Sequence, residues 1–155
     1  MRPFPWLFAA LLAVLALPVH AQPGGLVTRP SAHNARATID RFNQAVRDAN
    51  WVVFTEIDHA AAARVVDLKL PARTVVLFGN PRAGTTAMQG KPTLALDLPM
   101  RVLVWEDDQG RVFVTRSTGA DIATRVFARH GITVPPEGQQ NTENLLDGLV
   151  RKATE

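Results

Sequence analysis

Two strand-like runs separated by a four-residue turn constrain the fold of this chain most strongly. Residues 101–106 and 111–116 are rich in β-branched and aromatic side chains, and residues 107–110 join them. Gly110 can adopt the positive φ that such a hairpin turn needs. The strands of a hairpin are antiparallel, so the sheet that contains them is mixed or antiparallel. The sequence therefore predicts an α+β domain.

The rest of the chain shows helical and strand patterns in turn. Apolar residues at spacings of three, four and three indicate an amphipathic helix over residues 34–49, which Ser31 or Asn34 can cap. Strand-like runs follow at residues 51–57 and 74–78. The remaining expected elements are short helices at residues 59–66, 85–89, 122–130 and 145–150, and a loop at 135–140. We expect a single compact domain over residues 34–155, with four to five strands, flanking helices and a lead-in segment at 22–33.

The first 21 residues have the layout of a secretory signal peptide. Arg2 gives a positive start, residues 6–17 are twelve consecutive apolar residues, and Ala21 ends a small-residue cleavage site. Twelve apolar residues are too few to span a bilayer, which needs about 20. We therefore expect cleavage before Gln22, no stable membrane anchor afterwards, and a periplasmic or secreted location.

Charge and cysteine content exclude several classes of function. Lys and Arg number 17 against 14 Asp and Glu, and no run of basic residues exceeds two, so a nucleic-acid partner is not expected. The chain of 155 residues has no cysteine. This excludes disulfides, thiolate metal sites, iron–sulfur clusters and c-type haem attachment. The residues specify no cofactor.

Residues 79–86 have the spacing of a phosphate-binding loop and follow a predicted strand. Thr85 stands where such a loop has lysine, so the clamp on the terminal phosphates is missing. A weaker hypothesis is that exposed amides of Gly84 and Thr85, beside Asn80 and Arg82, hold a small anion at a helix N-terminus. The alternative is that two glycines and a proline only make a tight turn.

Two acidic positions and a histidine are further candidates for a site. Asp58 precedes an expected helix, whose positive end favours a neutral His59 imidazole that can act as a ligand or general base. The alternative is a structural cap with a surface histidine. Asp97 lies in an apolar run and is either hydrogen-bonded to backbone amides or part of a site. His59 and Met88 are weak candidates for a soft-metal or haem pair, unless Met88 fills the core.

Four motifs in order resemble the family called domain of unknown function 302 (DUF302). They are EIDHAAAA at 56–63, LFGNPRAGT at 77–85, LDLP at 96–99 and VWED at 104–107, within a resemblance over about residues 38–131. The resemblance implies a compact α+β fold and no mechanism, because the family's activity is not established. Its motif residues correspond to Asp58, His59, Asn80, Pro81, Gly84, Thr85, Met88, Asp97 and Trp105. This chain departs from the family at Thr86-Ala87, commonly Pro-Leu, and at Arg116-Ser117, commonly Tyr-Asn.

These residues support three hypotheses. The favoured one is a module that binds a small ligand or ion in a cleft walled by His59, Asn80, the Gly84 and Thr85 amides and Asp97. The second is a small enzyme with His59 as general base, oriented by Asp58 or Asp97, and an anion held by the same amides. The third is a stress-related interaction protein without a small-molecule site. Binding is favoured because no nucleophile–base motif occurs, and the ligand, partners and oligomeric state stay open.

Overall fold

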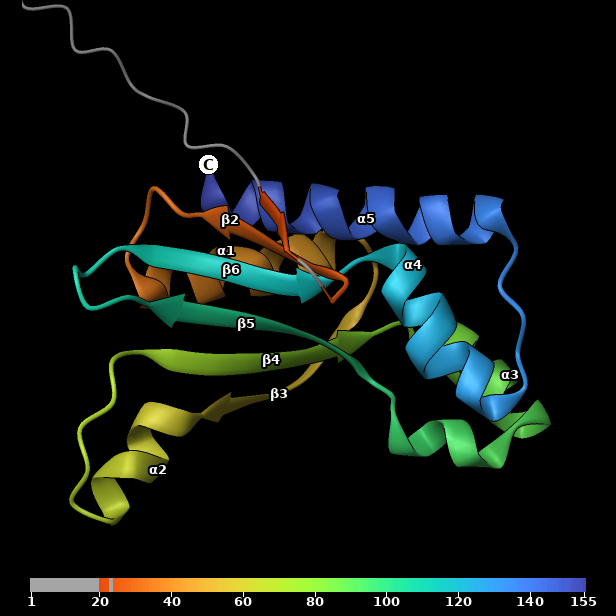
Figure 1. Cartoon of the computed structure of the whole chain (residues 1–155), viewed down its shortest axis with the longest axis horizontal. Helices are drawn as coiled ribbons and strands as arrows, with labels where there is room; N and C mark the ends of the chain where they lie inside the picture. Colours follow the sequence, from red (N-terminus) through yellow and green to blue (C-terminus); the bar gives the residue numbers. More distant parts are fainter. Residues whose placement is uncertain (1–19, 23) are drawn as a thin grey trace, which may run out of the picture.

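Six antiparallel strands form one open sheet in the computed structural model, which describes residues 20–22 and 24–155 (Figure 1). Their order across the sheet is β1-β2-β6-β5-β4-β3. The strands are β1 (His20–Gln22), β2 (Leu26–Pro30), β3 (Val52–Asp58), β4 (Arg73–Gly79), β5 (Met100–Glu106) and β6 (Val112–Ser117). The helices are α1 (Ala35–Asp48), α2 (His59–Val65), α3 (Pro81–Gly90), η1 (Pro92–Leu96), α4 (Gly119–Asp121), η2 (Ile122–Phe127), η3 (Ala128–His130) and α5 (Pro136–Thr154). The α+β class is confirmed.

The hairpin predicted from the sequence is β5–β6, near the middle of the sheet. Gly110 has a φ of 76°, as its turn requires. The Asp107 carboxylate accepts hydrogen bonds from the amides of Gln109 and Arg111, at 3.0 and 2.9 Å. This acid is therefore part of the turn.

One face of the sheet packs against α1 and α5 and forms the core. Because side chains alternate along a strand, every second residue of β4, β5 and β6 points to these helices. The buried set includes Phe42, Val46, Val76, Phe78, Val102, Val104, Val114, Leu146, Leu149 and Val150. The rings of Phe42 and Phe78 meet edge to face with centroids 5.0 Å apart. Figure 1 shows α1 behind the strands and α5 along one edge.

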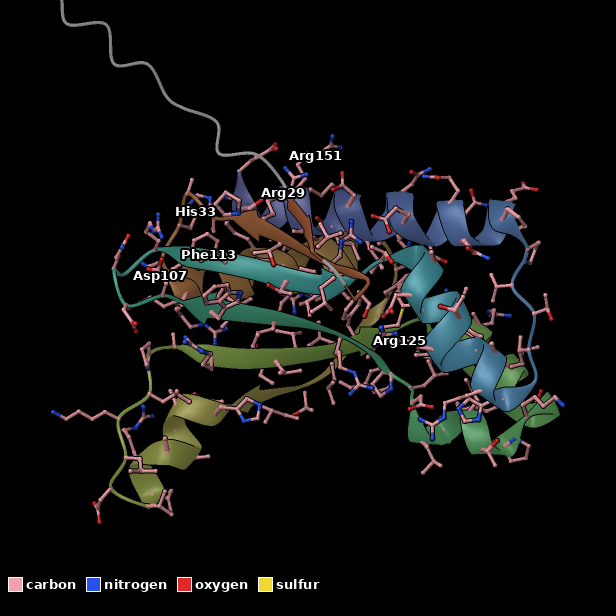
Figure 2. The ribbon with its side chains drawn as sticks, in the orientation of Figure 1. Arg29, His33, Asp107, Phe113, Arg125 and Arg151 are labelled. Atoms are coloured by element: carbon pink, nitrogen blue, oxygen red, sulfur yellow. The ribbon has the colours of Figure 1, made fainter. Side chains whose placement is uncertain are left out.

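The opposite face of the sheet carries half-buried aromatic residues shielded by arginines. Trp105 and Phe113 stack with ring centroids 4.8 Å apart. The Arg73 guanidinium lies 5.5 Å from the Trp105 ring centroid, and that of Arg111 lies 5.6 Å from the Phe113 centroid. The indole nitrogen of Trp105 donates to the Thr115 hydroxyl at 2.8 Å. Phe113 and Arg29, which lies on β2, are labelled in Figure 2.

Helix α5 is longer than the sequence analysis predicts. The prediction of a loop at residues 135–140 is wrong, because the helix begins at Pro136 and runs for 19 residues. Proline suits the first helical position, where its missing N–H has no intrahelical partner to lose. The buried residues Leu146, Leu149 and Val150 outweigh the low helix propensity of Gly148.

A buried arginine attaches α5 to the sheet. The Arg116 side chain on β6 is 3% exposed and donates to the Glu143 carboxylate of α5 at 2.7 Å. The other Glu143 oxygen accepts from the Gly119 amide of α4, also at 2.7 Å. Residue 116, where the chain departs from the DUF302 pattern, therefore connects β6, α4 and α5.

The N-terminal part of the chain differs from the predicted domain layout. Strand β2 pairs with β6 over its whole length, so the lead-in at residues 22–33 is an integral part of the domain. Residues 1–19 of the expected signal peptide lie outside the described residues, whereas His20 and Ala21 lie in β1. In the part of the chain that the structure describes, no helix is both long and apolar enough to cross a membrane.

Candidate functional site

A cavity of about 600 Å³ lies where β3 begins and β4 ends. Its walls come from both strand ends, α3, the segment between η1 and β5, η2 and α5. The lining residues are Trp51, Phe54, Gly79, Asn80, Pro81, Ala83, Gly84, Thr85, Ala87, Met88, Leu98, Pro99, Met100, Ile122, Phe127, Asn141, Thr142 and Leu145. A volume of this size is typical of small-molecule sites.

The chemistry of the cavity is apolar, with a few hydrogen-bonding groups. None of the lining residues carries a charge. Aromatic surface comes from Trp51, Phe54 and Phe127. Phe54 occupies a register shift between Val53 and Thr55 in the pairing of β3 with β4, and it is 53% exposed. The bulge thus leaves an aromatic side chain exposed beside the cavity.

The start of α3 overturns the anion-site hypothesis for Gly84 and Thr85. The helix begins at Pro81, and the Asn80 side chain accepts hydrogen bonds from the amides of Arg82 and Ala83, at 3.0 and 3.2 Å. The Gly84 amide donates to the Asn80 carbonyl at 2.9 Å, so it lies within the helix. The free amides that an anion needs are therefore absent here, because the asparagine cap uses them. Asn80, Gly84 and Thr85 do line the cavity, whereas Arg82 does not.

Asp58 and His59 lie at the opposite end of the β3–β4 pair. Val52 pairs with Gly79 at the cavity, whereas Asp58 pairs with Thr74, six residues along the strand. At about 3.3 Å per residue this separates them from the cavity by about 20 Å. The prediction that His59, Asn80 and Asp97 wall a single cleft is therefore wrong.

The structural interpretation of Asp58 is confirmed. Its carboxylate caps α2 by accepting from the Ala61 amide at 2.9 Å. His59 is exposed in the first turn of that helix. Neither Asp58 nor Asp97 is hydrogen-bonded to the His59 ring, so the predicted orientation of His59 as a general base is also wrong.

Asp97 belongs to a hydrogen-bonded chain of side chains that the sequence did not reveal. Its carboxylate lies 2.6 Å from Nε2 of His130 and 3.2 Å from the Arg129 guanidinium. Nδ1 of the same ring lies 2.9 Å from the Thr93 hydroxyl. The His130 side chain is 4% exposed. These contacts connect η1 and Asp97 to η3. Asp97 directly precedes Leu98, and η3 directly follows Phe127, and both Leu98 and Phe127 line the cavity.

The distances from Thr93 to His130 and from His130 to Asp97 are those of a nucleophile, base and orienting acid. However, none of these three residues lines the cavity. The hydrogen bond from His130 holds the pKa of Asp97 below its usual value, although partial burial opposes this effect, and the positive charge of Arg129 adds to it. An ionised Asp97 keeps Nε2 as a donor, and Nδ1 can then accept from Thr93, or donate to it when the ring is protonated. We interpret these hydrogen-bonded side chains as a structural connection that holds η1 and η3 together beside the cavity.

No group of three or more histidine, aspartate or glutamate side chains that could hold a metal occurs among residues 20–22 and 24–155. Met88 lines the apolar cavity, whereas His59 lies at the far end of the sheet. The weak hypothesis of a His59–Met88 metal or haem pair is therefore wrong.

Comparison with known proteins identifies the family. The model of the family described as "Domain of unknown function DUF302" matches residues 27–150. The chain belongs to the DUF302 family. A solved structure of an uncharacterized conserved DUF302 protein from Bacillus stearothermophilus covers 83% of this chain and 98% of its own, with a TM-score of 0.68 and 11% identity. At this identity the likeness shows a shared DUF302 fold only.

Curated relatives of this DUF302 chain carry the name of a transport protein. This DUF302 chain is 44% identical over 101 residues to proteins called fluoride-specific ion channel FluC 1 from Brucella suis biovar 1 and Brucella abortus biovar 1. The match covers 65% of this chain but only 40% and 37% of those relatives. The channel name therefore describes proteins of more than twice the length that this DUF302 chain matches.

Sequence reasoning missed most of the cavity wall of the DUF302 domain. Trp51 and Phe54 were assigned to a strand and Phe127 to an amphipathic helix, each as a structural residue. Asn141 fell just beyond an expected loop. The signals in the sequence were the motif residues at 77–85, Met88 and the LDLP motif at 96–99, which line the cavity in part.

Proposed function

We propose that this DUF302 domain is a binding module for an uncharged, largely apolar small molecule. The observation that carries the proposal is the 600 Å³ cavity, because all of its lining residues are uncharged. A charged ligand would lose its hydration there without gaining an opposite charge. The small-ligand part of the sequence-based hypothesis is therefore retained, and the ion part is not.

The arrangement of polar groups supports an apolar ligand with one or two hydrogen-bonding groups. Thr85 lies on α3, and Asn141 and Thr142 lie on α5. Aromatic and thioether side chains, Trp51 and Met88 among them, also line the cavity. Such a wall favours flat or flexible apolar groups, since it makes dispersion contacts without strict directional requirements.

Filling the cavity from Gly84 tests this proposal. A Cβ built on Gly84 lies 3.8 Å from Leu98 and 4.0 Å from Met88, which is ordinary contact, so a β-carbon is accommodated beside two residues that line the cavity. We expect Gly84→Leu to weaken binding of the neutral fluorescent probe N-phenyl-1-naphthylamine by about tenfold or more. Fluorescence titration of the purified chain measures this change.

Gly90→Leu is the matched control, because Gly90 lies on the same helix, outside the cavity, and a Cβ added to it has no atom within 4 Å. It should bind the probe like the wild type. Inorganic phosphate should not displace the probe. Equal probe binding by the wild type and Gly84→Leu, or displacement by phosphate, would contradict the proposal.

Export of the chain is a second part of the proposal. The apolar run at residues 6–17 and the small-residue site that ends at Ala21 support it. We expect mass spectrometry of the protein from the periplasm or medium to show a chain that begins at Gln22. Cleavage there would remove two of the three residues of β1 and leave β2 as the edge of the sheet. An intact Met1 on the exported protein would contradict this expectation.

A further inference from the structure

The end of α2 exposes four large aliphatic side chains within six residues. Val65, Val66, Leu68 and Leu70 are exposed by 83, 63, 64 and 40%. Figure 1 shows that α2 and the chain after it extend away from the end of the sheet. We call residues 64–70 the α2 tip. Clustered exposed aliphatic residues of this kind mark contact sites, because single exposed ones are usually scattered.

The α2 tip is an ordered turn that holds these side chains in place. The Leu68 amide donates to the Ala63 carbonyl at 3.0 Å, and the Asp67 amide donates to the Arg64 carbonyl at 3.2 Å. Asp67 has a φ of 58°, in the left-handed region. This is the Schellman pattern of helix termination. A residue other than glycine in that conformation costs about 1 kcal/mol of stability. The ordered apolar tip is therefore formed despite a local loss of stability at Asp67.

The charges around the α2 tip are mostly positive. Within residues 64–70, Arg64 and Lys69 stand against Asp67. The Arg73 guanidinium lies instead over the Trp105 ring and donates to the Glu106 carbonyl. Arg64 is 69% exposed, with its nearest carboxylate, that of Asp58, 3.9 Å away. Lys69 lies between two exposed leucines, so its aliphatic stem can extend along apolar surroundings while its ammonium group reaches phosphate.

We propose that the α2 tip inserts into the interface of a bilayer that contains anionic phospholipids. A protein partner would need a groove that matches a convex tip, whereas a bilayer accommodates such a tip and places phosphates beside its cations. Insertion of four aliphatic side chains supplies the apolar contribution, and Arg64 and Lys69 supply the charge complementarity. This peripheral contact is independent of the cavity and of its ligand.

Vesicle flotation of the purified chain tests this inference. The probes are vesicles of phosphatidylglycerol with phosphatidylcholine, and vesicles of phosphatidylcholine alone. The wild type should bind the anionic vesicles more strongly, and high salt should weaken that binding. We expect the triple variant Val65→Asn, Val66→Asn, Leu68→Gln to lose at least about tenfold of the partition coefficient.

Leu96→Gln is the matched control, because Leu96 on η1 is 76% exposed and lies outside the α2 tip. It should bind like the wild type, and any contribution of the N-terminal apolar run is common to all variants. Arg64→Gln with Lys69→Gln should remove the preference for anionic vesicles. Circular dichroism and probe binding verify that each variant is folded.

Two results would overturn the inference. One is equal vesicle binding by the wild type and the triple variant. The other is a wild type that does not bind vesicles but forms a dimer in light scattering, which the triple variant abolishes. The second result would assign the α2 tip to contact between copies of this chain.

Discussion

Replacing Gly119 by alanine is expected to destabilise the protein by about 3 kcal/mol, which lowers its melting temperature by about 10 °C. A Cβ at Gly119 would lie 2.2 Å from the carbonyl oxygen of Gln139 and 2.9 Å from the amide nitrogen of Glu143. Both atoms belong to the backbone of α5, so no side chain can rotate away to make room. The added methyl group therefore has to push α4 and α5 apart.

Gly148→Ala is the matched control within α5. A Cβ at Gly148 has no atom within 4 Å, and the position is interior to the helix. Alanine there should raise the free energy of unfolding by about 0.5–1 kcal/mol, because it has the higher helix propensity. Urea denaturation of both variants measures the two changes. Equal stability of Gly119→Ala and the wild type would show that α4 does not rest directly on α5.

Removing the charge partner of Arg116 should lower the free energy of unfolding by about as much as Gly119→Ala. Glu143→Ala leaves a guanidinium that is 3% exposed with only Asp147, at 3.8 Å, as an acidic neighbour. We expect a loss of about 3 kcal/mol in the free energy of unfolding, the cost of an uncompensated buried charge. Asp40→Ala, which removes a partner of Arg36 in a pair that is 60% exposed on both sides, should cost less than about 0.5 kcal/mol.

The double variant Arg116→Met, Glu143→Leu separates the pair from the packing around it. If the loss in Glu143→Ala comes from the orphaned charge, the apolar pair should recover most of it in the same urea titration. No recovery would show that the connection from Glu143 to the Gly119 amide, rather than the charge on Arg116, carries the effect.

Acid should weaken the same connection. Burial raises the pKa of Glu143, but the hydrogen bonds from Arg116 and the Gly119 amide together outweigh it, so the pKa lies below the usual value near 4.5. A lowered folded-state pKa means that the stabilisation is fully present above about pH 4.5 and is lost as the pH falls further. The wild type should therefore lose more stability than Glu143→Gln on acidification below this value.

These connections also bear on the cavity, because α5 and η2 supply part of its wall. Asn141, Thr142 and Leu145 come from α5, and Ile122 and Phe127 come from η2, directly after α4. A variant that separates α4 from α5 displaces both contributions. Gly119→Ala should therefore also weaken binding of the naphthylamine probe, whereas Gly148→Ala should not.

Local chemistry in the sequence determined several elements and their ends. Spacings of three and four residues predict α1, and Asn34 caps it by accepting from the Ala37 amide. Asp58 caps α2 in the same manner, and Gly110 and Gly131 adopt the positive φ values that their turns need. These features depend on neighbours a few residues away, so the sequence alone determines them. The α+β class followed from the hairpin for the same reason.

Only the tertiary structure decided how distant residues meet. The register of β3 against β4 places His59 and Asn80 at opposite ends of the sheet, although they are only 21 residues apart in the chain. Asp97 meets His130, 33 residues away, and Arg116 meets Glu143, 27 residues away. The cavity combines segments from Trp51 to Leu145. Strand pairing and helix docking create these contacts. Local periodicity and motifs do not predict which distant residue a polar side chain contacts.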